Sequence, residues 1–410
     1  MEHAAREGKF TYDPHILKHQ VKSVLCIPLI KHGQLNGVIY LENNVTSGVF
    51  TEDRLKVINM LSAQMVVSLE NATLYKQLND ALENQVKLAN EQVELTNAYS
   101  RFVPREFLSL LGKKSIVDVQ LGEPLEKEIT IMFSDIRGFT ELSEQMTPQE
   151  NFNFINSYLH HQSPVIREHH GFIDKYIGDG IMALFPTNAD EAVKASIAML
   201  EKLKIYNQGR TRAGYRPINI GIGLNTGVLM LGTVGDQERM DGTVISDAVN
   251  LASRIESMTK IYGVSLLISE TTYFQLENPA DYAIRIIDQV QAKGKSEPVT
   301  VFEVFNADPP NIVEAKLKTM VLFRQGFKLY HRTKFAEAQA LFNEVLEADA
   351  ASKQQHIAEA KELFEEILHV NPHDKVARLY LDRCEQIQKY GVPDEWAGVW
   401  AWVTSLKNRG

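Results

Sequence analysis

The stretch GFIDKYIGDGIMALFP, residues 171–186, consists of two short apolar segments on either side of a Gly-Asp-Gly turn. This pattern predicts a β-hairpin that turns at residues 178–180. A hairpin turn requires glycine but no carboxylate, and an apolar strand requires no lysine. Asp179 in the turn and Lys175, four residues before it, are therefore candidate functional residues of this hairpin.

Strands and helices alternate around this hairpin over residues 127–305. We expect strands at residues 128–136, 171–178, 180–186, 218–227, 229–235, 264–270, 282–290 and 299–305. We expect helices at residues 148–170, 190–208 and 246–263. The order strand, helix, hairpin, helix, strand predicts an α+β fold with a ferredoxin-like sandwich.

A second carboxylate, Asp135, ends the apolar strand ITIMFSDI. Either Asp135 or Asp179 alone would be read as a turn-forming residue. In a ferredoxin-like sheet, however, the first strand lies beside the central hairpin, so both side chains can converge at one edge. Two hard oxygen ligands that leave positions open for phosphate oxygens suit Mg²⁺ or Mn²⁺. With two such ions, one can activate an attacking hydroxyl while the other binds the departing phosphates.

Three segments, FSDIRGFTELSEQMTPQE, GFIDKYIGDGIMALFP and TVISDAVNLASRIESMTKIYG, resemble the signature segments of class III adenylyl cyclases. The resemblance covers residues 127–305. It implies an enzyme that converts ATP to 3′,5′-cyclic AMP and pyrophosphate at the interface of a homodimer, where each site is built from both protomers. A guanylyl cyclase and a catalytically silent nucleotide-sensing module are the alternatives.

The resemblance implies a role for each matching residue of the metal site. Asp135 and Asp179 match the metal ligands, and Ile136 would supply a backbone carbonyl. Two Mg²⁺ or Mn²⁺ ions per active site are expected. Phe139 and Thr140, which follow in the same segment, are expected to contact the substrate.

The resemblance also implies the groups that bind the nucleotide. Lys175 matches the lysine that reads adenine in the partner's site, and Thr243 stands where many members carry an adenine-reading Asp. An ammonium can donate to N1, and a hydroxyl can accept from the exocyclic amine. Guanine reverses this pattern. Asn250 and Arg254, one helical turn apart, match the pair that orients the ribose and stabilises the transferring phosphate. Lys293 matches the lysine that binds the terminal phosphates. Alone, NLASR would be an ordinary amphipathic helix and Lys293 a solvated turn lysine.

Threonine at position 243 adds an expectation about regulation. The cyclase subtype with threonine here includes bicarbonate-responsive enzymes, so bicarbonate is expected as an activator.

Residues 21–42 read as two strands joined by a turn at His32-Gly33, and a helix follows from Thr51. This order looks like the C-terminal half of a GAF domain, which we place at residues 1–68. The first half of that fold is missing, so the chain is expected to start inside a longer protein.

The helix continues to about residue 98 without glycine or proline. We predict a dimeric coiled coil at residues 69–100; the alternative is a single helix packed on its own domain. A connector at residues 101–126, in which Pro104 opens a short helix, leads to the catalytic domain at residues 127–308. The apolar seam of the coiled coil comprises Leu74 and Leu78, then Leu82, Val86, Ala89 and Val93 after a four-residue step.

Residues 309–410 form a helical region. Two short segments have the spacing of tetratricopeptide (TPR) repeats: Gly326, Ala338 and Phe342 in the first, and Ala360, Phe364 and Pro372 in the second. Because about three repeats are needed for a stable solenoid, we expect these TPR-like helices to pack on the preceding domain or to form a docking tail.

The composition excludes several other classes of protein. The net charge of −9 disfavours nucleic acid as the main partner. The two cysteines, Cys26 and Cys384, offer neither a disulfide framework nor a CxxC metal site, which favours a reducing, cytoplasmic location. No signal peptide is recognisable and no apolar run approaches ~18 residues, so no membrane segment is expected.

Overall fold

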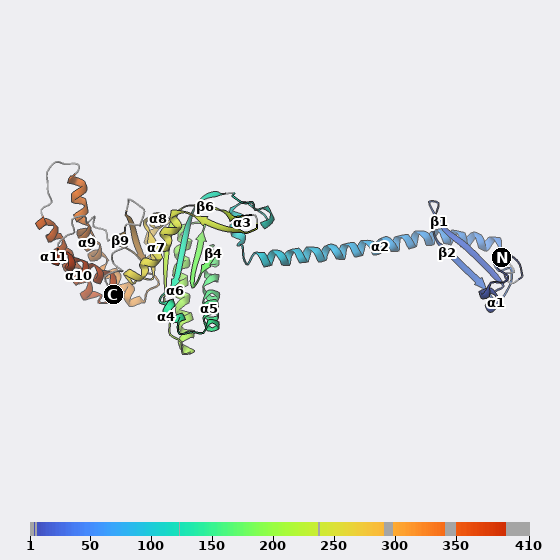
Figure 1. Ribbon diagram of the computed structural model, residues 1–410, viewed down its shortest axis with the longest axis horizontal. Helices are drawn as coiled ribbons and strands as arrows, with labels where there is room; N and C mark the ends of the chain where they lie inside the picture. Colours follow the sequence, from blue (N-terminus) through green and yellow to red (C-terminus); the bar gives the residue numbers. More distant parts are fainter. Residues whose placement is uncertain are drawn as a thin grey trace. The chain divides into compact units, whose positions relative to one another are not determined.

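The computed structural model describes residues 4, 6–122, 124–236, 238–290, 298–340 and 350–390, without the side chains of residues 31, 332–340 and 350–354. The chain divides into two compact units, Met1–Arg101 and Phe102–Gly410, which are described one at a time (Figure 1).

The first unit contains an antiparallel hairpin and a long helix. Strands β1 (Ser23–Lys31) and β2 (Gln34–Asn43) pair with each other, and the turn between them has positive φ angles of 46° at His32 and 79° at Gly33. Glycine adopts such an angle without steric cost, which explains why the turn includes Gly33. The predicted strand–turn–strand is confirmed. The short helix α1 (Pro14–His19) precedes it.

Helix α2 (Glu52–Tyr99) is a single helix of 48 residues, as the absence of glycine and proline predicts. Its buried residues, Ser62 and Val66, lie in its first half, close to the hairpin. The side chains expected to form the coiled-coil seam are exposed in this chain, Leu74 and Leu78 by 55% each. The coiled coil itself stays a prediction.

The second unit is built on one mixed sheet. Among the described residues its strand order is β4-β5-β3-β6-β8-β10-β9, and β7 pairs with residues 230–235 of β6. Strands β6 and β8 run parallel, whereas the other pairs are antiparallel. The strands are β3 (Leu125–Ile136), β4 (Phe172–Ile177), β5 (Gly180–Phe185), β6 (Ile220–Gly235), β7 (Met240–Ile245), β8 (Leu266–Ser269), β9 (Ile284–Val290) and β10 (Val299–Val304).

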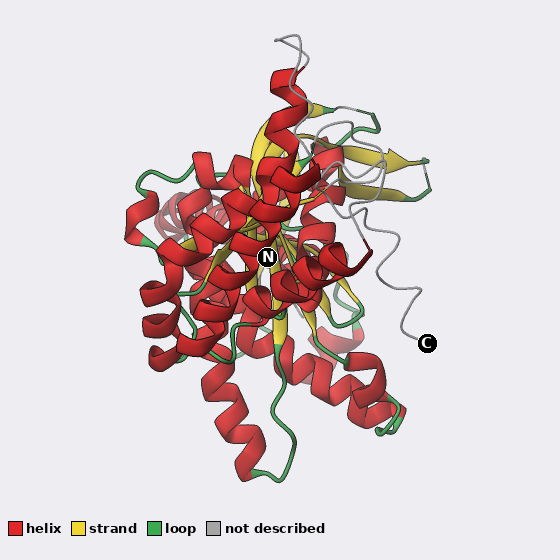
Figure 2. Ribbon diagram, turned by 90° about the vertical axis from the view of Figure 1, so that its left-hand side faces the viewer, coloured by secondary structure: helices red, strands yellow, loops and turns green. Residues whose placement is uncertain are grey.

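Helices flank this sheet (Figure 2). They are α3 (Arg105–Leu110), α4 (Phe139–Ser143), α5 (Pro148–Glu168), α6 (Ala189–Arg212), α7 (Asp247–Tyr262), α8 (Glu270–Phe274), α9 (Pro310–Ala340), α10 (Ala350–Val370) and α11 (Lys375–Tyr390), with 3₁₀ turns at Ile116–Asp118 and Pro279–Asp281.

The central strands bury side chains on both faces. In β5, Ile181, Ala183 and Phe185 belong to the core that α5 and α6 cover, while Met182 and Leu184 belong to the core that α7 and α3 cover. This alternation is the period of two expected of a strand. Because both faces are covered, the strand reads in the sequence as a continuous apolar run.

Helix α7 lies unusually close to β6. A Cβ atom at Gly223 would lie 2.1 Å from the backbone nitrogen of Glu256, and one at Gly221 would lie 2.2 Å from Oγ1 of Thr259. The glycines of GIGLNTG therefore form a seat for α7, and the side-chain amide of Asn225 donates to the carbonyl of Ala248 at 2.9 Å. The close packing of α7 on β6 therefore explains why this strand is rich in glycine.

Two parts of the predicted sheet are wrong in detail. Residues 218–227 and 229–235 were expected as two strands. Residues 220–235 instead form the single strand β6, because one residue between the two segments is too short for a turn. Strand β7, which includes Asp241 and Gly242, was not expected at all. It is held by its pairing with β6, a contact that local sequence does not reveal.

The C-terminal helices α9, α10 and α11 pack on α7 and on strands of the sheet within the second unit. Phe323, Phe364 and Tyr380 of the tail share one core with Ile255 of α7 and Val301 of β10. This is the packing alternative expected for the tail. Its TPR-like character stays a prediction, and the side chain of Ala338 and the whole of Phe342 lie outside the described residues.

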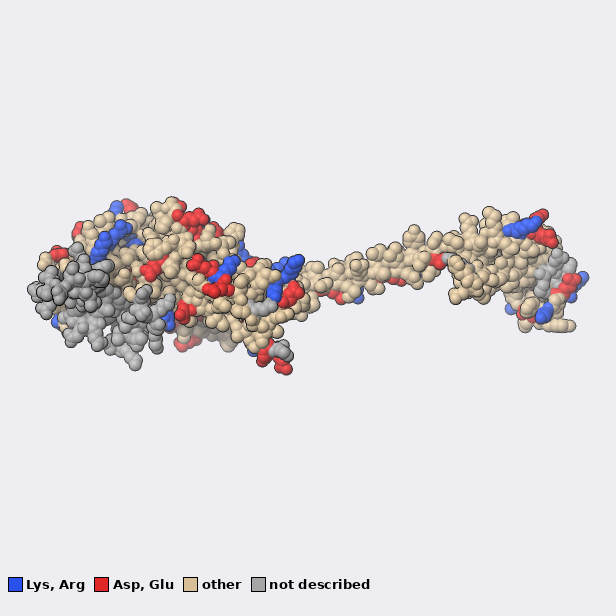
Figure 3. Space-filling model, turned by 90° about the horizontal axis from the view of Figure 1, so that it is seen from above, with Lys and Arg blue, Asp and Glu red and all other residues tan. Residues whose placement is uncertain are grey.

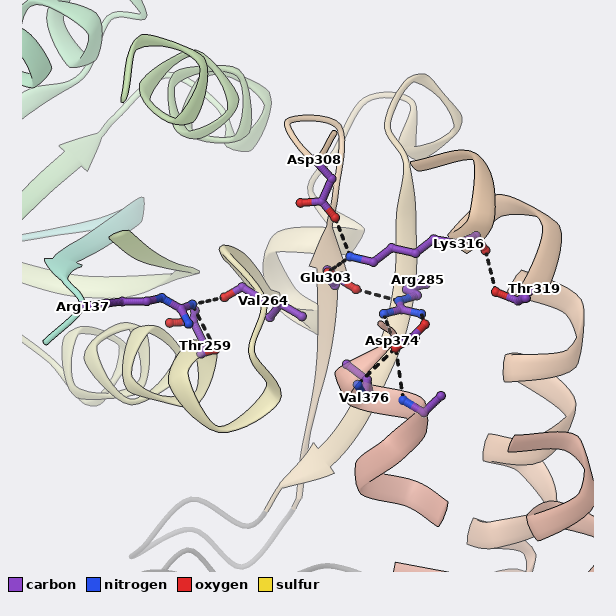
Figure 4. A network of polar contacts seen from close by, with 11 residues as sticks. Arg137, Thr259, Val264, Arg285, Glu303, Asp308, Lys316, Thr319, Asp374 and Val376 are labelled. Carbon is purple, nitrogen blue, oxygen red and sulfur yellow. Dashed lines mark hydrogen bonds and ion pairs between the residues drawn. The ribbon is translucent and has the colours of Figure 1, made fainter. Parts of the chain in front are cut away.

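Buried ion pairs join the tail to β9 and β10. Arg285 contacts both Glu303, at 2.6 Å, and Asp374, at 2.5 Å (Figure 4). Lys316 contacts Glu303 at 2.6 Å and Asp308 at 2.5 Å. The tail is thus tied to the sheet by charge as well as by apolar packing.

Within the described residues, none of the helices combines the length and apolar character that crossing a membrane requires.

Candidate active site

The two carboxylates meet where β3 ends beside the β4–β5 turn. Asp135 is the penultimate residue of β3, and Gly178, with a φ of 63°, turns the chain so that Asp179 follows it. Strand β5 pairs with β3 up to Ser134. The backbone N–H of Ile136 donates to Oδ2 of Asp179 at 3.2 Å. The structure therefore brings together Asp135, Ile136 and Asp179, as the strand order predicts.

Gly180 allows this close approach. A Cβ atom at this position would lie 3.2 Å from the carbonyl oxygens of Ile177 and Ser134 and 3.4 Å from Oδ1 of Asp135. The second glycine of the Gly-Asp-Gly turn thus keeps the turn against the end of β3.

The electrostatics of the pair favour a cation. Desolvation, then the charge of Asp179 and a hydrogen bond with it, raise the pKa of Asp135 to about 7. Desolvation also raises the pKa of Glu256, on α7, to about 7, and the charge of Asp179 adds to this shift. Three carboxyl groups therefore disfavour one another's ionisation. A divalent cation would remove that repulsion.

The oxygen donors fit a hard cation whose coordination shell is completed by other ligands. In the described chain no cluster of three or more His, Cys, Asp or Glu side chains has the arrangement of a metal site. Asp135, Asp179 and the carbonyl of Ile136 supply oxygen donors, which Mg²⁺ and Mn²⁺ prefer. Mg²⁺ commonly takes its remaining ligands from water and substrate phosphates, so an incomplete protein set suits it.

Lys175 and Thr243 also meet, although they stand 68 residues apart. The ammonium of Lys175 donates to Oγ1 of Thr243 at 3.2 Å. The register of β4 against β5 shifts between Ile173 and Lys175, and Thr243 lies opposite Gly232 in the β6–β7 hairpin. The two residues expected to read the base are therefore neighbours.

Asp174 is a member of this group that sequence reasoning missed. Its Oδ2 lies 3.4 Å from Nζ of Lys175, and its side chain is only 3% exposed. Burial raises the pKa of Asp174 despite the opposing charge of Lys175, and Asp241 adds to the shift. A buried carboxylate held beside a lysine at such cost is a candidate positioning residue. The Asp-Lys dipeptide was the available signal.

Helix α7 carries the next pair. Its N-terminus is capped by Ser246, whose hydroxyl accepts from the backbone N–H of Ala248 at 3.0 Å. Asn250 is exposed and Arg254 half-buried. Both lie within the helix, one turn apart, as expected, and thus on one face.

Arg137 links the end of β3 to the far end of α7. Its guanidinium donates to the carbonyl of Thr259 at 3.1 Å and to that of Val264 (Figure 4). Burial lowers the pKa of Arg137, and the charge of Glu256 opposes this shift. Sequence reasoning missed both Arg137 and Glu256, although Arg137 stands in the same FSDIRGFT segment as Asp135.

The remaining predicted residues are placed less directly. Phe139, the first residue of α4, is half-buried and stacks on Phe154 with ring centroids 6.4 Å apart. Thr140 is exposed. Lys293, between β9 and β10, lies outside the described residues.

Comparison with known proteins gives matches in both units. The family described as the adenylate and guanylate cyclase catalytic domain matches residues 123–304, and the GAF domain family matches residues 3–69. An adenylate cyclase of Anabaena cylindrica is 43% identical over 221 residues, which are 52% of this chain and 44% of that protein.

Two further similar proteins are also named adenylate or adenylyl cyclases. The terminal-differentiation-specific adenylate cyclase of Dictyostelium discoideum is 36% identical over 307 residues, which are 73% of this chain and 13% of that protein. The crystal structure of the adenylyl cyclase CyaB from P. aeruginosa is 36% identical and covers 44% of this chain and 95% of that chain, with a TM-score of 0.40. The chain spans less than half the length of the two curated relatives.

Proposed function

We propose that this protein, whose residues 123–304 belong to the class III nucleotidyl cyclase family, is an adenylyl cyclase. It converts ATP to 3′,5′-cyclic AMP and pyrophosphate. The observation that carries the proposal is the hydrogen bond to Thr243 from Lys175, a residue of the hairpin that also carries Asp179. The names of the curated relatives support the same activity.

Asp135, Asp179 and the carbonyl of Ile136 are the groups that hold the divalent metal, two ions per site. When bound, Mg²⁺ or Mn²⁺ lowers the pKa of the ribose 3′-hydroxyl and neutralises charge on the phosphates. The two aspartates are held against each other by the turn at Gly178 and Gly180, so little reorganisation is needed to present both to a cation. Phe139 and Thr140 continue this segment toward the substrate.

Lys175 and Thr243 read the adenine. The ammonium of Lys175 donates to adenine N1, and the hydroxyl of Thr243 accepts from the exocyclic amine. Guanine presents a donor at N1, and the Lys175 ammonium, which has no acceptor, would be left unmatched there. Asp174 holds the Lys175 ammonium in place. Unmatched buried polar groups cost enough to explain a preference for ATP.

Asn250, Arg254 and Lys293 act on the sugar and phosphates. Asn250 orients the ribose, and Arg254 offers a planar pair of donors to the phosphate that is attacked. Lys293 acts as a point charge on the terminal phosphates. Since phosphoryl transfer depends mainly on positioning and charge neutralisation, these residues need no further base.

A turnover assay with ATP and GTP, each with Mg²⁺ and with Mn²⁺, tests this function. We expect cyclic AMP formation with ATP, a much lower rate with GTP, and loss of activity in Asp179→Ala. A preference for GTP would identify the protein as a guanylyl cyclase. Activity equal to that of Asp179→Ala under all conditions would leave a catalytically silent nucleotide-sensing module.

Bicarbonate stimulation belongs to the same proposal, because Thr243 is typical of the bicarbonate-responsive subtype. The assay at fixed pH and ionic strength, with bicarbonate replacing chloride, should show a rise in rate. A flat response would remove this part of the proposal and leave the rest intact.

A further inference from the structure

A cavity lies on the second unit between α5 and α6, apart from the carboxylate pair. It has a volume of about 740 Å³ and is bounded by the end of α4, by α5, by the C-terminal half of α6 and by residues 213–216. Ligand pockets typically measure about 300–1,000 Å³. The size therefore suits a small molecule.

Arg210 is the unusual residue of this cavity. It lines the cavity and is only 8% exposed. Its Nε donates to the carbonyl of Arg216 at 2.8 Å, and no carboxylate pairs with it within the part of the chain that the structure describes. Buried charges are normally paired, because removing an ion from water is costly. Arg210 therefore lacks the counter-ion that its burial calls for.

Aromatic rings surround the Arg210 guanidinium. Its central carbon lies 4.6 Å from the ring centroid of Phe154, 5.5 Å from that of Tyr215 and 6.0 Å from that of Tyr206. Such cation–π contacts orient the guanidinium and offset part of its desolvation. The cation–π contacts do not use the terminal N–H donors of Arg210. These donors can bind an acceptor that lies in the plane of the guanidinium.

The other charges of the cavity add to the positive potential. Lys202 and Arg216 also line it, and Glu150 is its one acidic residue among the described lining. The Glu150 carboxylate is occupied as a helix cap, accepting from the N–H and hydroxyl of Thr147 at 2.8 and 2.7 Å. His161 is engaged through Nδ1 with the carbonyl of Ser157 at 2.8 Å.

This basic cavity contrasts with the net charge of the chain. The chain has a net charge of −9, and on the face that Figure 3 shows, acidic and basic side chains are interspersed. A concentration of basic groups around one cavity focuses its potential on anions. The walls also include apolar and aromatic side chains, with Leu142, Met146, Ile205 and Tyr215 among them, beside the polar Gln145, Asn153 and Ser157.

We propose that this cavity binds a small anion with an apolar or aromatic body, such as a carboxylate, sulfonate or phosphate ester. The anionic head pairs with the Arg210 guanidinium. The body packs against Phe154, Tyr206, Tyr215 and the aliphatic side chains.

The position of the cavity gives the ligand a route to the active site. The ring of Phe154 contacts Arg210 on the cavity side and stacks on Phe139 at 6.4 Å, with an interplanar angle of 16°. Phe139 begins α4, which follows Asp135 directly after a short turn. An occupied cavity therefore acts on the segment that carries Asp135. This regulatory part rests on the proposed cyclase function.

Binding to the full chain is tested by fluorescence titration with 8-anilinonaphthalene-1-sulfonate, an aromatic anion, followed by competition. We expect saturable binding at one site per chain that octanoate displaces, while octylamine, of the same length and opposite charge, does not. Arg210→Gln should weaken binding at least tenfold. Arg212→Gln, an exposed neighbour on the same helix that does not line the cavity, should bind like the wild type.

A second variant keeps the test decisive if Arg210→Gln fails to unfold cooperatively. Ile205 lines the cavity and is 63% exposed, so Ile205→Glu should preserve the fold while repelling an anion and weakening binding. Absence of saturable binding, equal displacement by octylamine, or wild-type affinity in the cavity variants would overturn the proposal. Binding with the expected charge preference in a protein that forms no cyclic nucleotide would instead refute the proposed function and leave the ligand site standing.

Discussion

Lys175 and Asp179 stand four residues apart in one hairpin, yet their side chains contact different partners. Lys175 contacts Asp174 and Thr243, while Asp179 accepts from the backbone of Ile136. A register shift in β4 beside Lys175 separates the two environments. The hairpin therefore carries two independent functional groups, and each can be tested alone.

Substituting Asp174 tests the positioning of Lys175. The pKa of Asp174 is raised by burial, so the ionised carboxylate weakens the folded state, and Asp174→Asn should unfold at the same temperature as the wild type or higher. Without its counter-ion, Lys175 should hold adenine less well. We expect KM for ATP to rise about tenfold with a smaller change in kcat.

Asp241→Asn is the control, because it removes a nearby charge without removing the Lys175 ion pair. A lower unfolding temperature of Asp174→Asn together with an unchanged KM would show that the residue is only structural.

At the scale of elements, glycines decide how closely helices approach the sheet. Gly221 and Gly223 seat α7 on β6, and Gly242 of β7 makes room for α3. A Cβ atom at Gly242 would lie 2.8 Å from the ring of Phe107, which is 3% exposed in the core under α7. Phe107 of the connector therefore packs directly against β7, the strand that carries Thr243.

Gly242→Ala should disturb Thr243 through this contact. Overpacking of this kind costs about 1–3 kcal/mol, so the unfolding temperature should fall and KM for ATP should rise. Phe107→Leu removes the ring atoms that the new methyl group meets. The double variant should therefore recover much of both losses, measured by thermal unfolding and steady-state kinetics. Additive losses in the double variant would contradict the contact.

At the scale of the whole second unit, the C-terminal helices complete the core instead of extending from it. Arg383 pairs with Asp288 of β9 at 2.7 Å, and the hydroxyls of Tyr262 and Tyr380 donate to the same carboxylate at 2.7 and 3.0 Å. Since β9 leads into the segment with Lys293, the tail supports a strand next to a predicted phosphate-binding residue.

This docking should be sensitive to acid. Burial alone would raise the pKa of Asp288, but Arg383 and His331 hold it well below its usual range. A depressed folded pKa stabilises the folded state above the unfolded pKa, and the gain is lost as pH falls below about 4. The unfolding temperature, followed from pH 7 to pH 3, should decline in that window.

Arg383→Gln leaves Asp288 buried without its arginine partner, which should cost about 3–5 kcal/mol at pH 7 and flatten the acid dependence. Lys318→Gln breaks an exposed ion pair with Glu314 and should change neither property. An unaltered acid profile in Arg383→Gln would show that Asp288 does not control docking.

Shared active sites are a property of the proposed homodimer. One chain carries both the metal ligands and the nucleotide-binding residues, so a mixed dimer of Asp135→Ala and Arg254→Ala chains should contain one intact site. A statistical mixture should then regain about a quarter of wild-type activity, because half of its dimers are mixed. Cyclic AMP formation after co-expression is the measurement.

A mixture of Asp135→Ala and Asp179→Ala chains is the matched control, since neither site of that dimer has both metal ligands. It should remain inactive. Activity equal in the two mixtures, or no recovery in folded and dimeric mixed chains, would count against shared sites.

The sequence by itself determined what depends on local pattern. The period of two in the apolar strands and the glycines at 33, 178 and 180 place the strands and hairpins, and Asp135 and Asp179 follow from adjacent strands. These features act over a few residues, so they are readable without the fold.

The tertiary structure alone decided the contacts between distant segments. The Lys175–Thr243 hydrogen bond depends on β7, whose pairing with β6 has no local signal. The burial of Asp174 and Asp288, the seat of α7 and the cavity around Arg210 likewise arise from surfaces that meet only when the sheet and helices pack. These features share one physical cause: water is excluded between segments that are far apart in the chain. This exclusion shifts the pKa values of ordinary charged residues and prepares them for function.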